Sequence, residues 1–463
     1  MKTVVVGAGM AATRLADELI DVGHDVTLLG DEPHPPYNRI LLSAVLEGTH
    51  DSANVALRIR DGVDLRLGTR VAEIDRGRGA VELADRSRLS YDRLVLATGS
   101  IPTLPPIRGL VGPDGSLHKR VHAFRTLDDC RRLDAAVPHA RTAVVVGGGL
   151  LGLQVARALS IRGLATEVVE GGEHLLRSQV DPRAGAILAR DLMRLGTAVY
   201  TGARVVRLTD DGPRTHVRLD NGYTLENVDL VVLTAGTRPS TTLARRAGLD
   251  VRRGVVVDQH LRTSDEHIHA IGDCAEHGSQ VTGFVPPAWE QAAVLARHLT
   301  GGDASYTGDR CVARLRATDL DVAVLGDPEH TDGDVVEVSN PVTGSHRKLV
   351  VRDGVIVAAT LVGDLSQVGL ITQHYDRATV LGPHEPGDLL MGQRSATDGG
   401  DVTRLHDDAV VCACAGVSAG RVRACRSLDA VRGTTRATTG CGGCADAVRS
   451  LLASRSLEGT TTP

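Results

Sequence analysis

The sequence predicts an α/β fold, because one pattern occurs twice: a buried strand, a glycine-rich turn, a helix and a second strand. The first copy covers residues 1–32, and the second begins at Thr142. A third region differs from both, because five of the eight cysteines fall between Cys412 and Cys444. We therefore expect two similar α/β units and a separate cysteine-rich unit near the C-terminal end.

The first unit begins with the pattern of a dinucleotide-binding turn. Residues 2–6 are rich in β-branched side chains, and residues 7–12 follow directly as GxGxxA. Gly7 permits the tight turn, and Gly9 lets the backbone approach a pyrophosphate. The small side chain of Ala12 lets the helix pack closely against the strand. A helix N-terminus at this place offers unpaired N–H groups to phosphate.

The rest of the first unit supplies an acid for a ribose. The helix has apolar positions at Leu15 and Leu19, and residues 25–29 form the second strand. Asp31 or Glu32, directly after that strand, is placed to accept hydrogen bonds from ribose hydroxyls. The flanking strand, the helix and the acid together favour dinucleotide binding over an ordinary strand-to-helix turn.

Length, charge and cysteine use limit the functions that fit this chain. A chain of 463 residues allows two to four domains. The net charge of -5 and the pI near 6.4 indicate no basic surface, so we expect no nucleic-acid partner. No signal peptide precedes the first strand and no apolar run can span a bilayer, so we expect a cytoplasmic protein without a membrane partner. The cysteines are expected to be metal ligands or buried thiols rather than disulfides.

The second unit repeats the signature with a different acid. Residues 142–146 form a strand, residues 147–152 read GxGxxG, and a helix and a strand at 166–169 follow. Glu170 at the end of that strand suits a free ribose 2′-hydroxyl and would repel a 2′-phosphate. The site is therefore predicted to bind NAD rather than NADP, although Arg177 nearby keeps NADPH open.

Three further segments mark the ends of buried strands. Residues 93–97, 229–233 and 267–271 each read as a strand that ends in a glycine turn. Ligands bind at the carboxyl ends of strands in open α/β sheets, so Asp273 is a candidate contact to a cofactor. The spacing fits equally an Asp273 that caps the following helix.

The second half of the chain is expected to contain a helix, a separate unit and a linker. Residues 287–299 have the pattern of a helix. Between about 304 and 394 the pattern changes to short strands, which predicts a small α+β unit. Residues 395–408 are polar and contain glycine without periodicity, so we expect a linker there.

The cysteine-rich tail has two cysteine pairs, CxC at 412–414 and CxxC at 441–444. Four thiolates in two close pairs match either a [2Fe-2S] cluster or a zinc site. The neighbouring glycines favour the cluster, because backbone amides near its sulfurs stabilise their negative charge. Cys425 stands outside both pairs, and its spacing suits a buried helix position better than ligation. The predicted metal ligands are Cys412, Cys414, Cys441 and Cys444.

With these motifs in this order, the chain resembles the pyridine nucleotide-dependent flavin oxidoreductases over about its first 300 residues. These enzymes share the glutathione reductase-like arrangement, in which an NAD domain is inserted into an FAD domain. The resemblance implies an FAD-binding domain at 1–110 and 240–303, an NAD(P)H-binding domain at 111–239, an α+β interface domain at 304–394, a linker at 395–408 and a helical [2Fe-2S] domain at 409–455.

Two segments carry a closer resemblance. Residues 31–43, DEPHPPYNRILLS, are similar to the flavin part of assimilatory NAD(P)H nitrite reductase large subunits. Residues 409–455 resemble the bacterioferritin-associated ferredoxin-like (BFD-like) [2Fe-2S] domain that follows the flavin part in those enzymes. By this resemblance Arg39 lies near the flavin or its phosphates, Val71 touches the adenine, and Trp289 lies near the isoalloxazine. The alternative for Trp289 is a core aromatic.

The resemblance and the motifs together define two sets of binding residues. The expected FAD contacts are Gly7, Gly9, Met10, Ala11, Ala12, Asp31, Glu32, Arg39, Val71, Ala97, Thr98, Gly99, Asp273 and Gln291. The expected NAD contacts are Gly147, Gly149, Leu150, Leu151, Gly152, Glu170, Arg177 and Gly236. No protein side chain is expected to act as a catalytic acid or base, because hydride transfer to a flavin needs alignment above all.

Two departures from the family pattern limit the chemistry. The disulfide reductases carry a redox cysteine pair in the first domain, whereas residues 1–129 here contain no cysteine. Thiol chemistry at the flavin is therefore excluded, and Cys130, Cys274 and Cys311 are expected to be buried or incidental thiols. The nitrite reductase large subunit continues into a sirohaem and iron–sulfur half that this chain lacks, so it is not expected to reduce nitrite alone.

These observations predict an electron-transfer flavoprotein. NADH would deliver hydride to FAD, and electrons would pass singly through a [2Fe-2S] cluster to a partner protein, with a nitrate or nitrite reductase catalytic subunit suspected. One alternative is an NADH:ferredoxin-type reductase that serves an oxygenase. Another is a redox sensor whose tail binds zinc. The resemblance also suggests a homodimer formed through the α+β unit.

Overall fold

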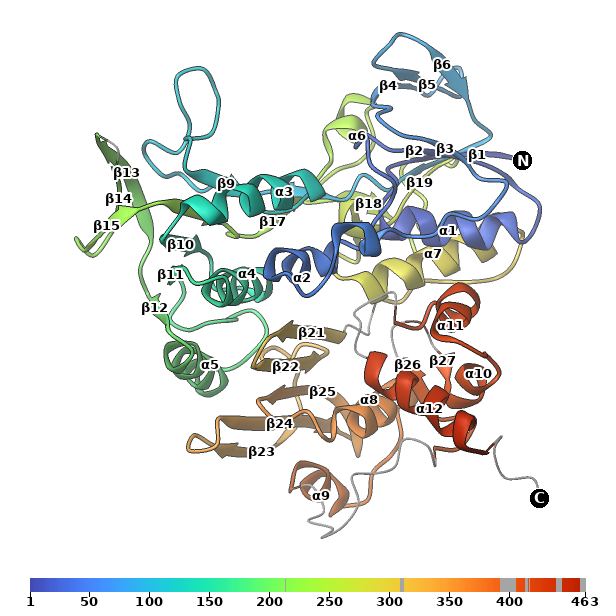
Figure 1. Cartoon of the computed structure of the whole chain (residues 1–463). Helices are drawn as coiled ribbons and strands as arrows, with labels where there is room; N and C mark the ends of the chain where they lie inside the picture. The colour runs from blue at the N-terminus through green and yellow to red at the C-terminus, as the bar shows by residue number, and fades with distance from the viewer. Residues whose placement is uncertain are drawn as a thin grey trace.

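The fold is described from a computed structural model, which covers residues 1–212, 214–308, 312–391, 405–412, 415, 417–438 and 444–458. Two five-stranded parallel sheets, a five-stranded antiparallel sheet and a C-terminal group of helices make up most of these residues (Figure 1). The predicted α/β class is therefore confirmed. None of the described helices has the length and apolar character that a membrane span requires.

The first parallel sheet joins strands that lie far apart in the sequence, in the order β19-β7-β1-β2-β3. Val4 and Val5 of the central strand are fully buried, as expected for a strand covered on both faces. Helices α1 (Met10–Ile20) and α7 (Val285–Leu299) pack side by side beneath it (Figure 1). The strands are β1 (Lys2–Val6), β2 (Asp25–Leu29), β3 (Asp64–Arg66), β7 (Arg93–Leu96) and β19 (Ile268–Ala270).

The strands of the second parallel sheet come between β7 and β19 of the first sheet in the sequence. Their order in the sheet is β12-β11-β10-β16-β9. Helix α4 (Leu150–Ile161) follows its glycine turn, as α1 follows the first. The two segments that connect the first sheet to the second pair with each other as an antiparallel ribbon. The elements are β9 (Val121–Ala123), β10 (Thr142–Val146), β11 (Ala165–Glu170), β12 (Thr197–Thr201), β16 (Leu230–Leu233), the ribbon strands β8 (Ser100–Pro102) and β17 (Thr237–Pro239), α3 (Leu127–Ala136) and α5 (Pro182–Arg194).

Shorter elements extend both units without entering the parallel sheets. Two three-stranded antiparallel sheets protrude, one from each unit. Helix α2 packs against α4 and so joins the first unit to the second. These elements are β4 (Val71–Asp75), β5 (Ala80–Leu83), β6 (Arg88–Ser90), β13 (Val205–Asp211), β14 (Arg214–Leu219), β15 (Thr224–Val228), α2 (Leu42–Glu47), α6 (Thr242–Arg246), β18 (Val255–Val257), β20 (Ala275–His277) and the 3₁₀ turns η1 (Arg39–Leu41), η2 (Ser52–Val55), η3 (Val137–His139) and η4 (Gly272–Cys274).

The C-terminal part contains an antiparallel sheet and a small helical unit that lies beside it (Figure 1). The sheet order is β21-β22-β25-β24-β23, and its apolar face packs on two helices. The elements are β21 (Val312–Ala317), β22 (Leu320–Leu325), β23 (Asp334–Asn340), β24 (Ser345–Arg352), β25 (Val355–Val362), α8 (Val368–Arg377), α9 (Glu385–Met391), β26 (Val410–Cys412), β27 (Val417–Ser418), α10 (Ala419–Arg423), α11 (Leu428–Thr435) and α12 (Ala445–Glu458).

Most expected elements occur, and several elements were not predicted, among them α3, α5, β3 and β12. The strands expected at 2–6, 25–29 and 142–146 have these bounds in the structure. Strand β3 was not predicted, because it is a short edge strand of polar, partly exposed residues without apolar alternation. The expected linker lies outside the described residues as far as position 404. The proposed domain boundaries remain predictions.

A buried ionic cluster joins the second unit to the antiparallel sheet. Asp181 caps α5 by accepting the amide of Ala184 at 2.9 Å, and its other oxygen lies 3.1 Å from Nε2 of the fully buried His346. Lys348 Nζ lies 3.9 Å from the same carboxylate oxygen and 2.8 Å from Glu329. Burial alone would raise the pKa of Asp181, but His346, the Ala184 amide and Lys348 outweigh burial and lower the pKa to about 2. Asp181 is therefore ionised at neutral pH and holds the two units together.

Replacing the charge at this junction is expected to destabilise the protein. Asp181→Asn keeps a helix cap but removes the carboxylate that His346 and Lys348 face, which costs about 1–3 kcal/mol in the free energy of unfolding. The matched control is Arg183→Gln on the same helix, whose exposed pair with Glu337 contributes less than about 1 kcal/mol. Chemical denaturation of both variants measures the difference, and equal losses would refute the role of Asp181.

Candidate active site

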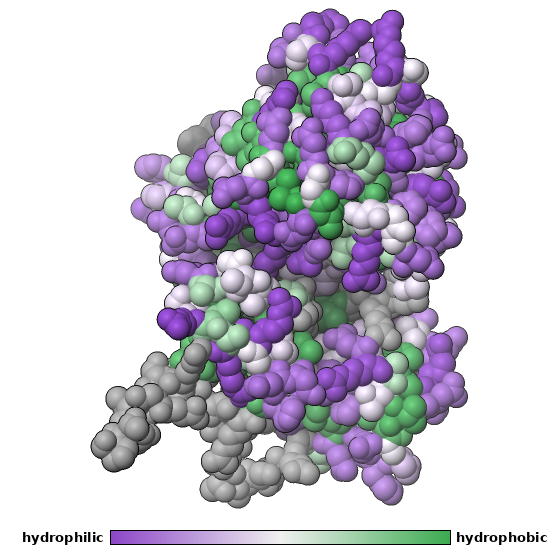
Figure 2. All heavy atoms as spheres, turned by 90° about the vertical axis from the view of Figure 1, so that its right-hand side faces the viewer, coloured by the Kyte–Doolittle hydropathy of each residue, from purple (hydrophilic) through white to green (hydrophobic). Residues whose placement is uncertain are grey.

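One large cavity lies where the two parallel sheets meet the C-terminal part of the chain. Its volume is about 1620 Å³, compared with ~300–1,000 Å³ for typical small-molecule pockets. Figure 2 shows a hollow in the middle of one face of the molecule, between its upper and lower parts. The lining comes from the first glycine turn, from the start of α4, from α7, from α8 and from the cysteine-rich unit. Such a volume accommodates a dinucleotide together with a second ligand.

The backbone of the first glycine turn faces the cavity at the N-terminus of α1. Gly7 has φ +112°, and a Cβ there would lie 2.2 Å from the carbonyl oxygen of Ala97, so no other residue fits. A Cβ at Gly9 would meet no protein atom within 4 Å, because it would point into the cavity. Ala12 is fully buried against the strand. The turn thus has the open cradle that a pyrophosphate needs.

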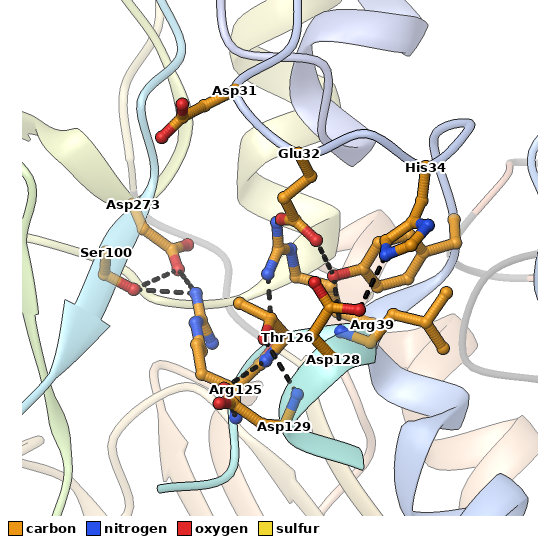
Figure 3. Close-up of polar contacts among 12 residues, drawn as sticks. Asp31, Glu32, His34, Arg39, Ser100, Arg125, Thr126, Asp128, Asp129 and Asp273 are labelled. Atoms are coloured by element: carbon orange, nitrogen blue, oxygen red, sulfur yellow. Dashed lines mark hydrogen bonds and ion pairs between the residues drawn. The ribbon is translucent and has the colours of Figure 1, made fainter. Parts of the chain in front are cut away.

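The two acids after β2 have different partners. Both oxygens of Asp31 accept from Arg70, at 2.9 Å from Nε and 2.8 Å from Nη2, and this pair is exposed. Glu32 points toward Arg39 and Tyr37, whereas Asp31 points away from them (Figure 3). Both acids line the cavity.

Arg39 and Tyr37 form a compact polar group with Glu32. The Tyr37 hydroxyl donates to Glu32 at 2.7 Å and accepts the amide of Leu127 at 2.9 Å. Arg39 pairs with Glu32, donates to the carbonyl of Arg125 at 3.2 Å, and lies over the Tyr37 ring at 5.1 Å. Burial raises the pKa of Tyr37 well above its ordinary value, so the hydroxyl stays protonated. The group fixes the position of the Arg39 guanidinium beside the cavity.

Asp273 is held by two residues that the sequence did not single out. Its Oδ2 accepts from Ser100 Oγ at 2.9 Å and from Arg125 Nη2 at 2.6 Å, and Arg125 also donates to Ser100 at 2.7 Å (Figure 3). The expectation that Asp273 might cap a following helix is wrong, because it lies inside η4 and α7 begins only at Val285. Asp273 lines the cavity at the carboxyl end of β19.

Gln291 and Trp289 of α7 stabilise the part of the cavity wall that carries Asp273. Gln291 is buried and accepts the amide of Gly272 at 2.7 Å, so it orients the turn that carries Asp273. Trp289 is largely buried, lines the cavity, and donates its indole N–H to the carbonyl of Met10 at 3.2 Å. Trp289 therefore belongs both to the core and to the cavity wall, and its proximity to a flavin ring remains a prediction.

The second glycine turn repeats the geometry of the first. A Cβ at Gly147 would lie 2.6 Å from the carbonyl oxygen of Thr234, and a Cβ at Gly152 would lie 1.9 Å from that of Gly147. A Cβ at Gly149 would meet no protein atom within 4 Å. Leu150 and Leu151, which follow this turn, line the same cavity as the first turn. The first turn and the start of α4 thus border one shared space.

The acid of the second unit stabilises its own turn. Glu170 accepts the amides of Gly148 and Gly172, each at 2.6 Å. The side chains of Arg177 and Arg204 lie against the adjoining loop, since a Cβ at Gly172 would lie 2.4 Å from Arg177. A carboxylate and two cations therefore surround the position expected for an adenosine ribose, and the choice between NADH and NADPH stays open. A Cβ at Gly236 would also meet no protein atom within 4 Å.

The cysteine-rich unit contributes two described thiols to the cavity wall. Cys412 on β26 and Cys444 before α12 are both buried and line the cavity. The backbone amide of Thr438 donates to Cys444 Sγ at 3.1 Å, which is the contact that stabilises a thiolate ligand. This donor fits a thiolate-held metal centre. The other two predicted ligands, Cys414 and Cys441, lie outside the described residues.

Among the described residues, the remaining cysteines do not take part in the site. Cys130 donates to the carbonyl of Leu42 at 3.4 Å, and Cys274 donates to that of Leu96 at 3.3 Å. Burial raises the pKa of Cys130 to about 12 and also raises that of Cys274, so both stay protonated. The expectation of buried thiols is confirmed for these two, whereas Cys311 lies outside the described residues. Cys425 is buried as expected, directly after α10 rather than within it.

Two dinucleotide turns, followed by helices whose first residues line one cavity, define a flavin- and pyridine nucleotide-binding oxidoreductase. The chain belongs to the pyridine nucleotide-disulphide oxidoreductase family, whose model matches residues 1–292. Residues 410–454 match the BFD-like [2Fe-2S] binding domain, and residues 312–375 match the rubredoxin NAD+ reductase C-terminal domain. The protein is thus an FAD-dependent NAD(P)H oxidoreductase that carries a [2Fe-2S] domain.

Similar curated proteins come from nitrogen metabolism. The chain is 33% identical over 97% of its length to nitrite reductase [NAD(P)H] of Bacillus subtilis, and 31% identical over 98% to the nitrite reductase (NADH) large subunit of Escherichia coli. It is also 31% identical over 97% of its length to the assimilatory nitrate reductase electron transfer subunit of Bacillus subtilis. The chain spans 57%, 55% and 59% of these relatives, respectively.

Solved structures agree on the fold. The putidaredoxin reductase–putidaredoxin complex has a TM-score of 0.76 at 27% identity, with 84% of this chain and 98% of that chain covered. The ferredoxin reductase for the CYP199A2 system of Rhodopseudomonas palustris has a TM-score of 0.74 at 28% identity, with 82% and 96% covered. Both neighbours are named as reductases of small electron-transfer proteins.

Because the space at Gly149 is open, we expect a substitution there to affect nucleotide binding without affecting folding. We expect Gly149→Ala to fold and retain FAD, because its Cβ meets no protein atom, but to raise the KM for NADH by about tenfold or more through contact with the pyrophosphate. Gly152→Ala is the contrast, since its Cβ would overlap the carbonyl of Gly147 and destabilise the fold. FAD content and NADH kinetics measure the two effects. An unchanged KM in Gly149→Ala would contradict this assignment.

Proposed function

We propose that this protein takes electrons from NADH and passes them through FAD and a [2Fe-2S] cluster to a partner reductase in assimilatory nitrate or nitrite reduction. The observation that carries the proposal is the shared cavity. Residues of the first glycine turn, the first two residues of α4 after the second turn and two cluster cysteines all line it. Donor, flavin and one-electron centre would therefore be neighbours, with no further carrier between them.

The residues around the cavity suit FAD in the first site. The Gly7 turn and the N-terminus of α1 would hold the pyrophosphate, while Arg39 and Asp273 border the remainder of the cavity. When bound, FAD accepts a hydride from NADH and releases electrons singly, which connects a two-electron donor to one-electron acceptors. The second turn would hold the pyrophosphate of NADH, with Leu150 and Leu151 at the entrance to the shared space.

The protein side chains position and shield rather than exchange protons. Arg39 and Arg125 are fixed by carboxylates, and the Tyr37 hydroxyl stays protonated because burial raises its pKa. Trp289 and the two leucines of α4 are apolar groups in the cavity wall, which limit the access of water to a transferred hydride. The arrangement therefore supports hydride transfer by alignment.

The electron balance defines what the acceptor must be. Hydride transfer removes two electrons from NADH, and each passage through a [2Fe-2S] cluster carries one. One NADH therefore reduces two one-electron acceptors and leaves NAD+ and one proton. A partner with its own redox centre satisfies this balance, and the nitrate reductase electron transfer subunit among the relatives supports such a partner.

The runner-up is an NADH:ferredoxin-type reductase that serves an oxygenase. The structurally similar ferredoxin and putidaredoxin reductases support it. The matched [2Fe-2S] domain, and the nitrite reductase that matches nearly the whole of this chain, favour nitrate or nitrite assimilation. A zinc-binding sensor is a third candidate, and iron with labile sulfide in the purified protein would exclude it. The preference for NADH over NADPH, the cytoplasmic location and a homodimer stay predictions.

An anaerobic NADH titration tests the relay. If the two centres are connected, full reduction needs about one and a half equivalents of NADH per chain, because FAD takes two electrons and the cluster one. Flavin absorbance and the EPR signal of a reduced [2Fe-2S] cluster report the two centres separately. An end point at about one equivalent without an EPR signal would refute the relay.

A cysteine variant tests the direction of flow. Cys444→Ser is expected to keep the reduction of an artificial dye by NADH at the flavin and to lose more than about 90% of electron delivery through the cluster. Cys425→Ser is the matched control, because Cys425 lies in the same unit and bonds to Thr434 instead. Equal losses of both activities in Cys444→Ser would contradict the scheme.

A further inference from the structure

A charged contact joins the cysteine-rich unit to the pyrophosphate-binding helix. Asp17 on α1 forms an ion pair with Arg436, the residue that directly follows α11. In Figure 1, α11 lies below α1 and α7 on the same side of the molecule. A second contact supports this placement, since a Cβ at Gly433 of α11 would lie 3.5 Å from the guanidinium of Arg58 in the first unit.

The pair is buried at the edge of the shared cavity. Asp17 is 7% exposed, and the Arg14 side chain beside the pair lines the cavity. Burial and the positive charge of Arg14 lower the pKa of Arg436 to about 10, which leaves its guanidinium protonated at neutral pH. A buried carboxylate in the middle of a helix is unfavourable without a counter-charge, so the contact is specific.

Arg436 has a left-handed backbone conformation at the end of α11. Arg436 has φ +60° at the C-terminal cap of α11, a conformation in which glycine is the usual residue. Arginine at this position accepts strain that glycine would avoid. From this turn the guanidinium reaches Asp17.

The same turn leads directly to a cluster cysteine. Thr438, two residues after Arg436, donates its amide to Cys444 Sγ at 3.1 Å and accepts from Arg432 of α11 at 3.1 Å. The position of the Cys444 sulfur is therefore tied to α11 and, through Arg436, to α1. Helix α1 in turn begins at the turn that would hold the FAD pyrophosphate.

We propose that Asp17 and Arg436 are positioning residues for electron transfer: their ion pair docks the [2Fe-2S] unit against the FAD-binding helix and so fixes the distance between the two centres. The inference rests on the proposed relay, in which one electron at a time leaves the reduced flavin for the cluster. Neither residue takes part in the chemistry. Without the ion pair the cluster unit can move away from the flavin, and electron transfer slows steeply as the separation of two redox centres increases.

Rapid mixing with NADH under anaerobic conditions measures the effect. We expect Asp17→Asn and Arg436→Gly to leave flavin bleaching by NADH within about twofold of the parent and to slow cluster reduction by ~10- to 100-fold. Arg436→Gly suits the left-handed turn, so loss of folding does not explain a slow step. The double variant is expected to be no slower than either single variant, because both remove one contact.

The matched control is Asp21→Asn, which removes an exposed pair between Arg60 and the end of the same helix. It is expected to reduce the cluster at the parental rate. An unchanged rate of cluster reduction in Arg436→Gly with FAD and cluster fully bound would overturn the proposal. Additive losses in the double variant would overturn it as well, because they would show two independent effects.

Hydrogen exchange separates this proposal from the relay itself. In both single variants, backbone amides of residues 10–20 and 428–438 are expected to exchange faster than in the parent, and this readout requires no electron flow. If the parent shows no cluster reduction by NADH, the relay fails while the docking contact is still tested by exchange. Unchanged exchange in both segments would refute the docking role.

Discussion

Both nucleotide turns depend on the close approach of a glycine to the last carbonyl of a neighbouring strand. Gly7 lies against Ala97, and Gly147 lies against Thr234, at distances that exclude any Cβ. This contact brings the start of each helix to the carboxyl edge of its sheet, where unpaired amides can meet phosphate. The antiparallel ribbon β8–β17 then joins the two sheets, and the first turn and the start of α4 line one cavity. The two glycine contacts and the ribbon thus bring the starts of α1 and α4 to the same cavity.

The sequence was sufficient for the parts that rest on local chemistry. Buried β-branched runs define β1 and β10, and the glycine spacing defines the turns that follow them. The two cysteine pairs identified the C-terminal unit, which matches a [2Fe-2S] domain. In each of these cases the signal lies within a few consecutive residues, and tertiary packing confirms what the local pattern indicates.

The sequence was not sufficient where distant loops meet. Arg125 holds Asp273 across 148 positions, and Leu127 donates to the Tyr37 hydroxyl across 90 positions, so no local pattern reports either contact. The role of Gln291 also changes with the structure, because the residue is buried behind the cavity wall and orients Gly272. Arg436 carries a signal that could have been noticed, since an arginine between a helical pattern and a cysteine motif occupies a place where glycine is common.

Charged contacts add to apolar packing where the C-terminal units meet the nucleotide-binding sheets. The antiparallel sheet shares a buried hydrophobic cluster with α4 and α5, and Asp181, which caps α5, also meets His346 of that sheet. Asp17 on α1 meets Arg436 of the cysteine-rich unit. Apolar packing alone would permit sliding, whereas a buried ion pair is satisfied only in one register. Asp17 lies about two turns along the helix whose first residues face the pyrophosphate site. In the proposed relay the same rigid element would hold the flavin at one end and the cluster unit further along, so a helix rather than a loop would determine the separation of the two centres.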